Sequence, residues 1–422
     1  MNPRSATGKR LFVIYFQDGY IGVAPTVLGF ANELTAAGHD VHIRGLETEY
    51  PSPGHLSPSC HVATFSRLTD EPLGVKLCSW MRRMKLATLL PLIELGWFAF
   101  RNLLLDRRIP AEQRGLRRIN IGVDLQGGVL AWWQSVLARS RYVWLSLELP
   151  GPPSYRRLEK LVGWLEARAL GSAAALIIQD PDRLRSLSRH RSPLPLRVFY
   201  VPNSAGPPAF RSPPASSDNY LRSSNNYLRR KLGIDPERFP YIALQAGMIQ
   251  EEVYPQELAK AFSRIDSGFA LVFHDRHKRS EKDPYVRLLR SHNSRNLFLS
   301  LDPVPFDEVD AVFASATVGL VFYRPVDDNF AMIASASGKL SFNLKHGIPV
   351  LMNSLPSLAA LNERYEFGVM VRDPQDPAEL SAALKTIMSR YDFYSANARR
   401  CFQEELDFQT KFVPLREFLE AL

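Results

Sequence analysis

Residues 334–350 read ASASGKLSFNLKHGIPV, in which small residues and a lysine open a helical pattern that stops at a glycine before an apolar segment. At a helix start the backbone N–H groups of Ser335, Ser337 and Gly338 can face a ligand, where the helix dipole adds partial positive charge and Lys339 adds a full one. The pattern predicts an anion-binding helix start followed by a buried strand. The alternative is an ordinary serine-capped helix, and the motif alone does not separate the two.

Length and composition predict a globular protein of two domains, with 422 residues, 45% hydrophobic and 23% charged. Cys60, Cys78 and Cys401 are widely spaced and match neither a disulfide framework nor a zinc-ligand pattern, which favours a reducing, cytoplasmic location. The apolar run at 11–16 is short and lacks a cleavage site, so it is predicted to be a first strand and not a signal peptide.

The net charge of +9 suits nucleic acid, an anionic membrane surface or phosphorylated ligands. Residues 80–108 place an apolar centre, interrupted by Pro91, Glu94 and Gly96, between clusters of arginine and lysine. This centre is shorter than the roughly 20 residues of a spanning helix. The segment is predicted either to lie on the inner face of an anionic membrane or to form a pair of buried helices. No RNA-binding signature accompanies the charge, so we expect no nucleic-acid partner.

Short apolar runs alternate with helical patterns along most of the chain, which predicts two doubly wound α/β domains. We expect an N-terminal Rossmann-like domain over 1–205, a linker or loop over 206–236, a second Rossmann-like domain over 237–405 and a C-terminal helix over 406–422 that packs back on the first domain. The strands are expected at 11–16, 41–43, 119–123, 142–147, 175–178 and 198–201 in the first domain, and at 241–244, 270–274, 297–300, 318–322, 349–352 and 369–371 in the second.

Open α/β sheets bind ligands beyond the carboxyl ends of their strands, so the loops at those ends carry the candidate residues. Gly19, Tyr20 and Gly22 follow the first strand, where glycines allow close backbone approach or form a flexible turn. Their spacing is not that of a dinucleotide site. Gly247 and His274 end the first two strands of the second domain and are predicted to face a ligand cleft.

The second domain resembles the donor-nucleotide domain of retaining GT-B glycosyltransferases of the family 4 type, also called group 1 glycosyltransferases. The resemblance lies in the order and spacing of a strand at 319–323, a loop with Asn329, a helix start at 335–340 and a G-x-P-V strand at 347–350. A further set of segments, at 145–149, 177–183, 201–204 and 302–306, resembles consecutive acceptor-domain and base-binding elements of the same enzymes.

This resemblance implies two facing Rossmann-like domains with a cleft between them. It also implies transfer of a sugar from a nucleotide-sugar donor to a glycan or lipid-linked acceptor with retention, in surface polysaccharide or glycolipid synthesis. No metal or further cofactor is expected, because fixed N–H groups and a cation can stabilise the leaving diphosphate. Lys339 and Glu148 are the expected catalytic residues, although Glu148 could instead cap the turn after it. The expected donor-binding residues are Gly247, His274, Pro305, Tyr323, Arg324, Asn329, Ser335, Ser337, Gly338, Lys339 and Leu340, and the expected acceptor-side residues are Gly19, Tyr20, Gly22 and Glu148.

The chain departs from the family pattern at this donor site. Phe342 stands where the family usually carries a glutamate that accepts hydrogen bonds from the ribose hydroxyls, and Ala334 stands where a second glutamate is usual. After Gly247 the usual arginine and lysine are missing, and Glu251 and Glu252 occupy that stretch. Two alternatives therefore stay open, a degenerate non-catalytic partner of an active enzyme and a nucleotide-sugar epimerase.

Overall fold

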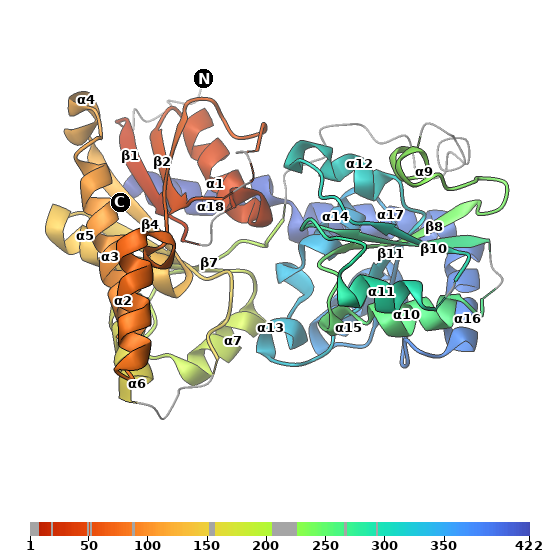
Figure 1. The fold of residues 1–422 in the computed structure, drawn as a ribbon. Helices are drawn as coiled ribbons and strands as arrows, with labels where there is room; N and C mark the ends of the chain where they lie inside the picture. Colours follow the sequence, from red (N-terminus) through yellow and green to blue (C-terminus); the bar gives the residue numbers. More distant parts are fainter. Residues whose placement is uncertain are drawn as a thin grey trace, which may run out of the picture. The chain divides into compact units, whose positions relative to one another are not determined.

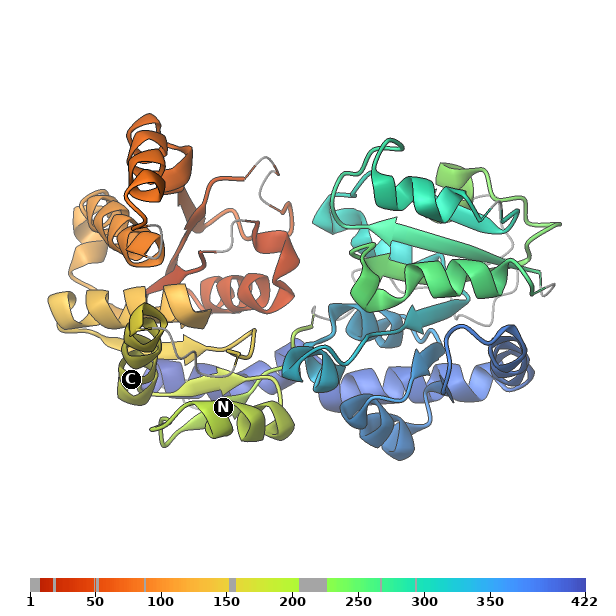
Figure 2. The ribbon, with the colours of Figure 1, turned by 60° about the horizontal axis from the view of Figure 1, so that its bottom comes forward.

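The computed structural model describes residues 8–17, 20–48, 50, 53–86, 89–151, 157–204, 226–265, 268–292 and 294–422. The chain divides into two compact units, unit 1 with Met1–Pro202 and Phe408–Leu422, and unit 2 with Asn203–Asp407. Each unit is built on one parallel sheet with helices on both faces (Figures 1 and 2). The predicted α/β class with two doubly wound domains is therefore confirmed.

Unit 1 carries a seven-stranded parallel sheet in the order β3-β2-β1-β4-β5-β6-β7. The order reverses between β1 and β4, so the carboxyl ends of these two strands form the topological switch point of the sheet. Every strand predicted for this domain is present. The strands are β1 (Arg10–Tyr15), β2 (Asp40–Leu46), β3 (Cys60–Phe65), β4 (Arg117–Val123), β5 (Arg141–Leu145), β6 (Leu176–Ile178) and β7 (Val198–Tyr200).

Edge strand β3 was not predicted from the sequence. It pairs with β2 in parallel, with Val41 beside Cys60 and Leu46 beside Phe65. Phe65 is the only residue of β3 that is buried, so the strand lacks the continuous apolar run that marks the central strands.

The helices of unit 1 hold the sheet between two layers. Helix α5 packs on β4 and β5 and contacts α3 and α6, and Figure 1 shows α3 and α5 side by side. Their apolar side chains enclose a core that includes Phe98, Leu130 and Ala169. The helical segments are η1 (Ile21–Val23), α1 (Pro25–Ala36), η2 (Leu68–Asp70), α2 (Pro72–Arg83), α3 (Leu90–Asp106), α4 (Ala111–Arg114), α5 (Asp124–Ala138), α6 (Arg157–Ser172), α7 (Pro181–His190) and α18 (Phe408–Ala421).

The C-terminal helix α18 packs on α1 of unit 1, although the whole of unit 2 lies between the two helices in the sequence. The Phe30 ring of α1 meets Phe408 with ring centres 5.9 Å apart and Phe412 at 4.8 Å. All three rings are buried, so α18 completes the hydrophobic core of unit 1 on that face.

Unit 2 carries a six-stranded parallel sheet in the order β10-β9-β8-β11-β12-β13, and every strand predicted for this domain is present. Figure 1 shows α12 and α14 on one face of this sheet and α10 and α11 on the other. Helices α15 and α17 share a core cluster with α14, and α16 shares one with α10 and α11. The order reverses between β8 and β11, which places the second switch point there. The strands are β8 (Tyr241–Gly247), β9 (Phe269–Asp275), β10 (Leu297–Ser300), β11 (Val318–Val321), β12 (Val350–Asn353) and β13 (Gly368–Val371).

Short helical turns link the strands and helices of unit 2 at several points. The helical segments are α9 (Tyr227–Leu232), η4 (Glu251–Val253), α10 (Pro255–Phe262), α11 (Pro284–Arg290), η5 (Phe306–Glu308), α12 (Val309–Ala314), α13 (Asp328–Ala331), η6 (Ala334–Ala336), α14 (Gly338–Lys345), α15 (Pro356–Tyr365), α16 (Pro377–Ser389), α17 (Tyr391–Cys401) and the π-helical η7 (Phe402–Leu406).

The predicted linker over 206–236 is wrong at its end, where helix α9 forms. Asn226 caps α9 by accepting from the N–H of Arg229 at 3.2 Å, and its amide donates to the Ser315 carbonyl at 3.0 Å. Leu228 is fully buried against the unit 2 core. Residues 206–225 of the predicted linker lie outside the described residues, as does the candidate Gly19.

None of the described helices combines the length and apolar character that crossing a bilayer requires. The predicted membrane segment forms two helices, α2 and α3, and three of its large apolar side chains are about half exposed: Trp80, Met84 and Phe100. Other side chains of the same helices are buried, among them Met81 and Phe98, so the choice between a membrane surface and a pair of packed helices stays open.

Candidate functional site

The switch point of unit 2 brings together three predicted residues from different elements. Gly247 ends β8, Tyr323 follows β11, and Lys339 lies in the first turn of α14. A Cβ atom placed on Gly247, whose φ is +126°, would lie 3.8 Å from Cε of Lys339. Glycine therefore provides the unusual backbone angle and brings the end of β8 close to the lysine stem.

The amine of Lys339 is buried and has no hydrogen-bond partner among the described residues. The residue as a whole is half-buried, because part of its stem reaches the surface while the amine does not. Nζ lies 4.6 Å from the centre of the Tyr323 ring, whose π face partly offsets the loss of water. Burial lowers the pKa of Lys339 to about 7. An ammonium in this position is therefore stabilised by an anionic ligand.

The start of α14 leaves two N–H groups for that ligand. The Ser337 hydroxyl caps the helix by accepting from the N–H of Leu340 at 3.0 Å, and its own N–H bonds to the Ala334 carbonyl at 3.4 Å. No described residue accepts from the N–H groups of Gly338 and Lys339. A Cβ on Gly338 would meet nothing within 4 Å, so space is open in front of the helix start. Of the three N–H groups predicted for an anion site, those of Gly338 and Lys339 therefore stay available, and that of Ser337 does not.

Tyr323 is fixed on both its backbone and its side chain. Asn353 at the end of β12 accepts from the Tyr323 N–H at 3.0 Å and donates to its carbonyl at 2.8 Å. The phenol oxygen lies 2.7 Å from the Ser337 hydroxyl, and burial raises the pKa of Tyr323 to about 12. The ring therefore stays neutral and holds the helix cap beside Lys339.

Arg324 is occupied by protein groups of its own unit. Its backbone N–H donates to the Glu252 carbonyl at 2.7 Å, its Nε donates to the Glu251 carbonyl at 2.9 Å, and its guanidinium pairs with the Glu257 carboxylate. The guanidinium also lies over the Tyr254 ring at 4.2 Å. These contacts tie Arg324 to the loop after β8, and its contact with a donor stays a prediction.

Arg276 is a cation at this site that the sequence analysis missed. It follows β9, its N–H donates to the Gly247 carbonyl at 2.8 Å, and Nη2 lies 2.9 Å from Sδ of Met248. Its side chain is exposed. Its positive charge partly offsets the rise in the pKa of Tyr323 that burial causes. Its position directly after a strand that neighbours β8, at the edge of the sheet where ligands bind, is the sequence feature that could have identified it.

Other predicted donor residues lie in the loops of the same unit. His274 ends β9 with Nδ1 2.8 Å from the Ser300 hydroxyl, and burial, with Lys231 nearby, lowers its pKa to about 4. His274 is therefore neutral at physiological pH. Pro305 is exposed before η5, and Asn329 is half-buried in α13.

Two further predicted residues of the opening motif, Ser335 and Leu340, have contacts within unit 2. Leu340 is fully buried, and the Ser335 carbonyl accepts from the N–H of Asn203 at 2.8 Å. Asp327 caps α13 by accepting from the N–H of Phe330 at 3.1 Å. The described residues contain no group of carboxylates, histidines and cysteines placed to hold a metal ion.

Phe342 belongs to the packing layer between α12 and α14. Its ring stacks on Phe313 at a centre distance of 4.9 Å and meets Phe306 edge-on at 6.4 Å. The same helix carries Lys345 and His346, which both bond to Asp310 at 2.9 Å. The position of the family's ribose-binding acid is therefore filled by an aromatic core contact.

In unit 1, Glu148 and the first-strand loop occupy the carboxyl edge of the sheet. The Glu148 side chain is exposed after β5. Tyr20 packs on Tyr50 with ring centres 5.2 Å apart, and a Cβ on Gly22 would lie 2.4 Å from the Tyr20 ring. Gly22 is therefore needed to seat Tyr20, which makes this segment a packed turn and not a flexible one.

Asp124 is a second missed residue, and it holds the Glu148 loop. It lies at the start of α5 with φ of +52°, in a conformation that is strained for a non-glycine residue. Its carboxylate accepts from the N–H groups of Leu147 at 2.7 Å and Glu148 at 3.0 Å. Burial raises the pKa of Asp124 to about 7. Arg183 also donates to the Leu147 carbonyl at 2.8 Å, so the loop is held from several sides.

Comparison with solved structures shows the same fold in glycosyltransferases. Sucrose-phosphate synthase from Thermosynechococcus elongatus matches with a TM-score of 0.67 and 15% identity over 98% of this chain and 99% of that one. HepE of Anabaena in complex with UDP-glucose matches with a TM-score of 0.64 and 13% identity over 98% and 100%. WaaG, a glycosyltransferase of lipopolysaccharide biosynthesis, matches with a TM-score of 0.59 and 14% identity over 95% and 99%.

At these identities the similarity establishes the GT-B fold of two Rossmann-like domains. No family model matches the sequence. No curated protein matches it either.

Proposed function

We propose that the protein is a retaining, metal-independent glycosyltransferase that binds a nucleotide-sugar donor in unit 2 and transfers the sugar to a glycan or lipid-linked acceptor. The observation that carries the proposal is the buried Lys339 amine, without a partner among the described residues, on the same helix start whose Gly338 and Lys339 N–H groups have no acceptor among them. A diphosphate matches both features, since it pairs with the amine and accepts from the amides. A shared fold with an Anabaena protein crystallised with UDP-glucose supports the same assignment.

The chemistry requires stabilisation of negative charge on the leaving diphosphate. Breaking the bond between the anomeric carbon and the phosphate oxygen leaves an oxocarbenium-like sugar and a nucleoside diphosphate. The Lys339 cation and the two fixed amides would act where this charge develops, and Arg276 would add a more exposed cation. These groups are already in position before the bond breaks, so little reorganisation of the protein is needed during the reaction.

Glu148 is proposed to orient the acceptor or donor hydroxyl from unit 1. Its loop is held by the Asp124 carboxylate and by Arg183, which limits the movement of the loop backbone. Such support is expected where a carboxylate must meet a hydroxyl at a defined position.

The test is binding and turnover with UDP, UDP-glucose and a panel of other nucleotide sugars. We expect calorimetric binding and slow donor hydrolysis by the wild-type chain, both lost in Lys339→Met and retained in Lys385→Met, an exposed lysine of the same unit. A folded wild-type protein that neither binds nor turns over any member of the panel would support the degenerate partner in place of the enzyme. Conversion of a free nucleotide sugar without acceptor, seen by NMR, would identify an epimerase instead.

Contact with the inner face of an anionic membrane is proposed through α2 and α3. Trp80 is 49% exposed and Phe100 is 50% exposed, and Arg82 and Arg83 lie in the last turn of α2. Aromatic side chains beside arginines suit the headgroup region of a bilayer. Flotation with phosphatidylglycerol vesicles should carry the protein upward at low salt and should carry much less of the Trp80→Ser with Phe100→Ser variant. Sedimentation of the wild-type chain away from such vesicles would contradict the contact.

A further inference from the structure

Unit 1 contains a cavity of about 500 Å³ at the amino ends of β1, β4 and β5. In a parallel sheet these ends lie opposite the carboxyl edge, where the Glu148 loop is found. The cavity therefore belongs to a different edge of the sheet from the proposed acceptor-side residues. Its volume is in the range of small-molecule sites. The charged residues that line it are Asp106, Arg114, Arg117, Arg118, Arg139 and Arg141.

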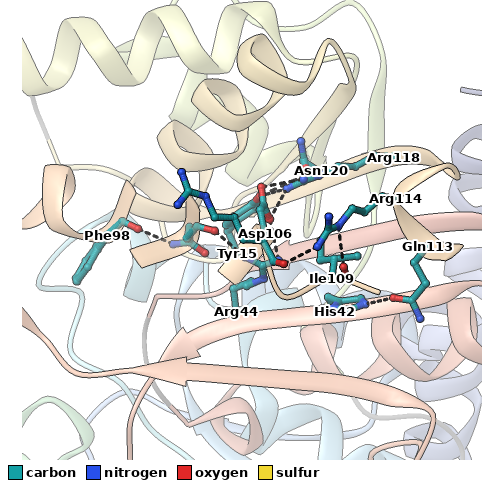
Figure 3. A network of polar contacts seen from close by, with 12 residues as sticks. Tyr15, His42, Arg44, Phe98, Asp106, Ile109, Gln113, Arg114, Arg118 and Asn120 are labelled. Atoms are coloured by element: carbon teal, nitrogen blue, oxygen red, sulfur yellow. Dashed lines mark hydrogen bonds and ion pairs between the residues drawn. The ribbon is translucent and has the colours of Figure 1, made fainter. Parts of the chain in front are cut away.

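Asp106, the single acidic residue among the described lining residues, is already neutralised (Figure 3). Its carboxylate bonds to Nη2 of Arg44 at 2.8 Å and to Nη1 of Arg118 at 2.9 Å. Arg118 is held further by the Tyr15 hydroxyl at 2.6 Å and the Asn120 amide oxygen at 2.8 Å. These contacts pair the negative charge of Asp106 with Arg44 and Arg118, so Asp106 does not neutralise the positive charges of the other arginines that line the cavity.

Three of those arginines keep their charge available. The side chains of Arg117, Arg139 and Arg141 are exposed, and no described carboxylate lies within 4.0 Å of them. Arg117 pairs with Arg10 in the β1–β4 register. The pKa of Arg10 is lowered mainly by burial and, second, by the positive charge of Arg117. Like charges gathered in one hollow raise the local positive potential and attract anions.

Arg114 shows that part of the wall is preorganised. Its Nε donates to the Ile109 carbonyl at 2.8 Å and its Nη2 to the Arg107 carbonyl at 2.5 Å, so the guanidinium is held against the turn after α3 (Figure 3). A fixed guanidinium loses less side-chain entropy when it binds an anion.

We propose that this arginine-lined cavity is a binding site for a phosphate group, carried either by the headgroup of an anionic lipid or by a free phosphorylated molecule. Guanidinium groups bind phosphate oxygens through paired, charge-assisted hydrogen bonds, and Arg117, Arg139 and Arg141 line this one cavity with no described carboxylate within 4.0 Å. The proposal does not depend on the donor site in unit 2.

An apolar surface adjoins the cavity, and this surface favours a phosphate that belongs to a lipid headgroup. A second cavity of about 210 Å³ shares Ser140 and Arg141 with the first and is also lined by Trp132 and Val136. The Val136 side chain is 63% exposed near the end of α5. A phosphate in the larger cavity would thus have apolar side chains within reach of any attached chain.

The experiment uses the whole chain with Lys339→Met, Trp80→Ser and Phe100→Ser, so that neither the candidate anion site of unit 2 nor the proposed membrane contact of α2 and α3 contributes. In this background we compare Arg117→Gln with Arg141→Gln against the control pair Arg189→Gln with Arg197→Gln, which removes the same charge from exposed arginines of unit 1 outside the cavity. Thermal unfolding checks that both pairs fold. Calorimetry with inorganic pyrophosphate probes the free anion, and flotation with phosphatidylglycerol and phosphatidylcholine vesicles probes the lipid.

The expected result is at least tenfold weaker binding in the cavity pair and less than twofold change in the control pair. Loss confined to pyrophosphate assigns a free phosphorylated ligand, and loss confined to phosphatidylglycerol vesicles assigns a lipid headgroup. Equal losses in both pairs, or no binding of either probe by the background chain, would overturn the proposal. Because the background already lacks Lys339, a failure of the donor-site proposal does not alter this outcome.

Discussion

The Nζ atom of Lys339 lies 4.6 Å from the centre of the Tyr323 ring, and the hydroxyl of the same ring is 2.7 Å from the Ser337 hydroxyl that caps α14. One aromatic side chain therefore serves both the amine and the helix start that together form the candidate anion site. Moving Tyr323 would disturb both, which explains why its backbone is fixed on each side by Asn353.

Lys339→Met should weaken UDP binding by about 1.5–3 kcal/mol, roughly 10- to 150-fold in Kd, because a charged hydrogen bond is lost. The same change should not lower the free energy of unfolding, since it removes a buried amine without a partner among the described residues. Lys345→Met is the contrast. It breaks an ion pair with Asp310 and should cost about 3–5 kcal/mol of stability. Calorimetry and urea unfolding measure the two effects.

UDP affinity should fall with rising pH above about 7, by up to tenfold per pH unit, because the amine of Lys339 has a pKa near 7 when the site is empty. In the unfolded chain this amine keeps its proton up to about pH 10.5, so its contribution to the unfolding free energy rises with pH between about 7 and 10.5. Calorimetry from pH 7 to pH 9 tests the affinity. The UDP affinity of Lys339→Met should not depend on pH. A UDP affinity that does not depend on pH in the wild type would contradict the assignment.

Arg276→Gln should weaken UDP binding by about threefold to tenfold, less than the loss of Lys339, because the exposed guanidinium is screened by solvent. The salt dependence of binding should also become shallower. Arg287→Gln removes an equally exposed charge from α11 of the same unit and serves as control. Equal affinities of the two variants would exclude Arg276 from the site.

Phe342→Glu should destabilise unit 2 by more than about 3 kcal/mol, because it places a carboxylate in the aromatic layer with Phe313. Phe342→Leu, which keeps the site apolar, should cost about 1–1.5 kcal/mol. We expect no gain in UDP affinity from the glutamate. Tighter binding by Phe342→Glu at unchanged stability would show that this position faces the ribose after all.

Asp124→Asn should increase stability at neutral pH relative to the wild type. The folded pKa of Asp124 is raised to about 7 from 3.8, so the folded state holds more protons than the unfolded state between these values. The contribution of Asp124 to stability is therefore lost as pH rises from about 4 to 7. Urea unfolding at pH 5 and pH 7.5 should show this loss in the wild type and in the exposed control Asp70→Asn, and not in Asp124→Asn.

The sequence predicted the sheets well because buried parallel strands are continuous apolar runs. It missed β3, whose residues are mostly at the surface, and it missed α9, which lies at the end of a polar, proline-rich stretch. In both cases the structure depends on contacts with neighbouring elements, with β2 and with the unit 2 core, that a local pattern does not contain.

The candidate site was predictable only in its local part. Lys339, Ser337 and Gly338 stand next to one another in the sequence, so their grouping at a helix start could be read directly. Arg276 and Asp124 act through neighbouring strands, which only the strand order reveals. Arg324 has the right charge and place in the sequence, but Glu257 occupies it from another helix.

The return of α18 to unit 1 bears on how the chain matures. Unit 2 is one uninterrupted segment, whereas unit 1 needs residues from both ends of the chain. During synthesis the buried Phe30 ring lacks Phe408 and Phe412 until the final helix has left the ribosome. Unit 2 can therefore complete its core before unit 1, whose Phe30 ring stays exposed until α18 packs on α1.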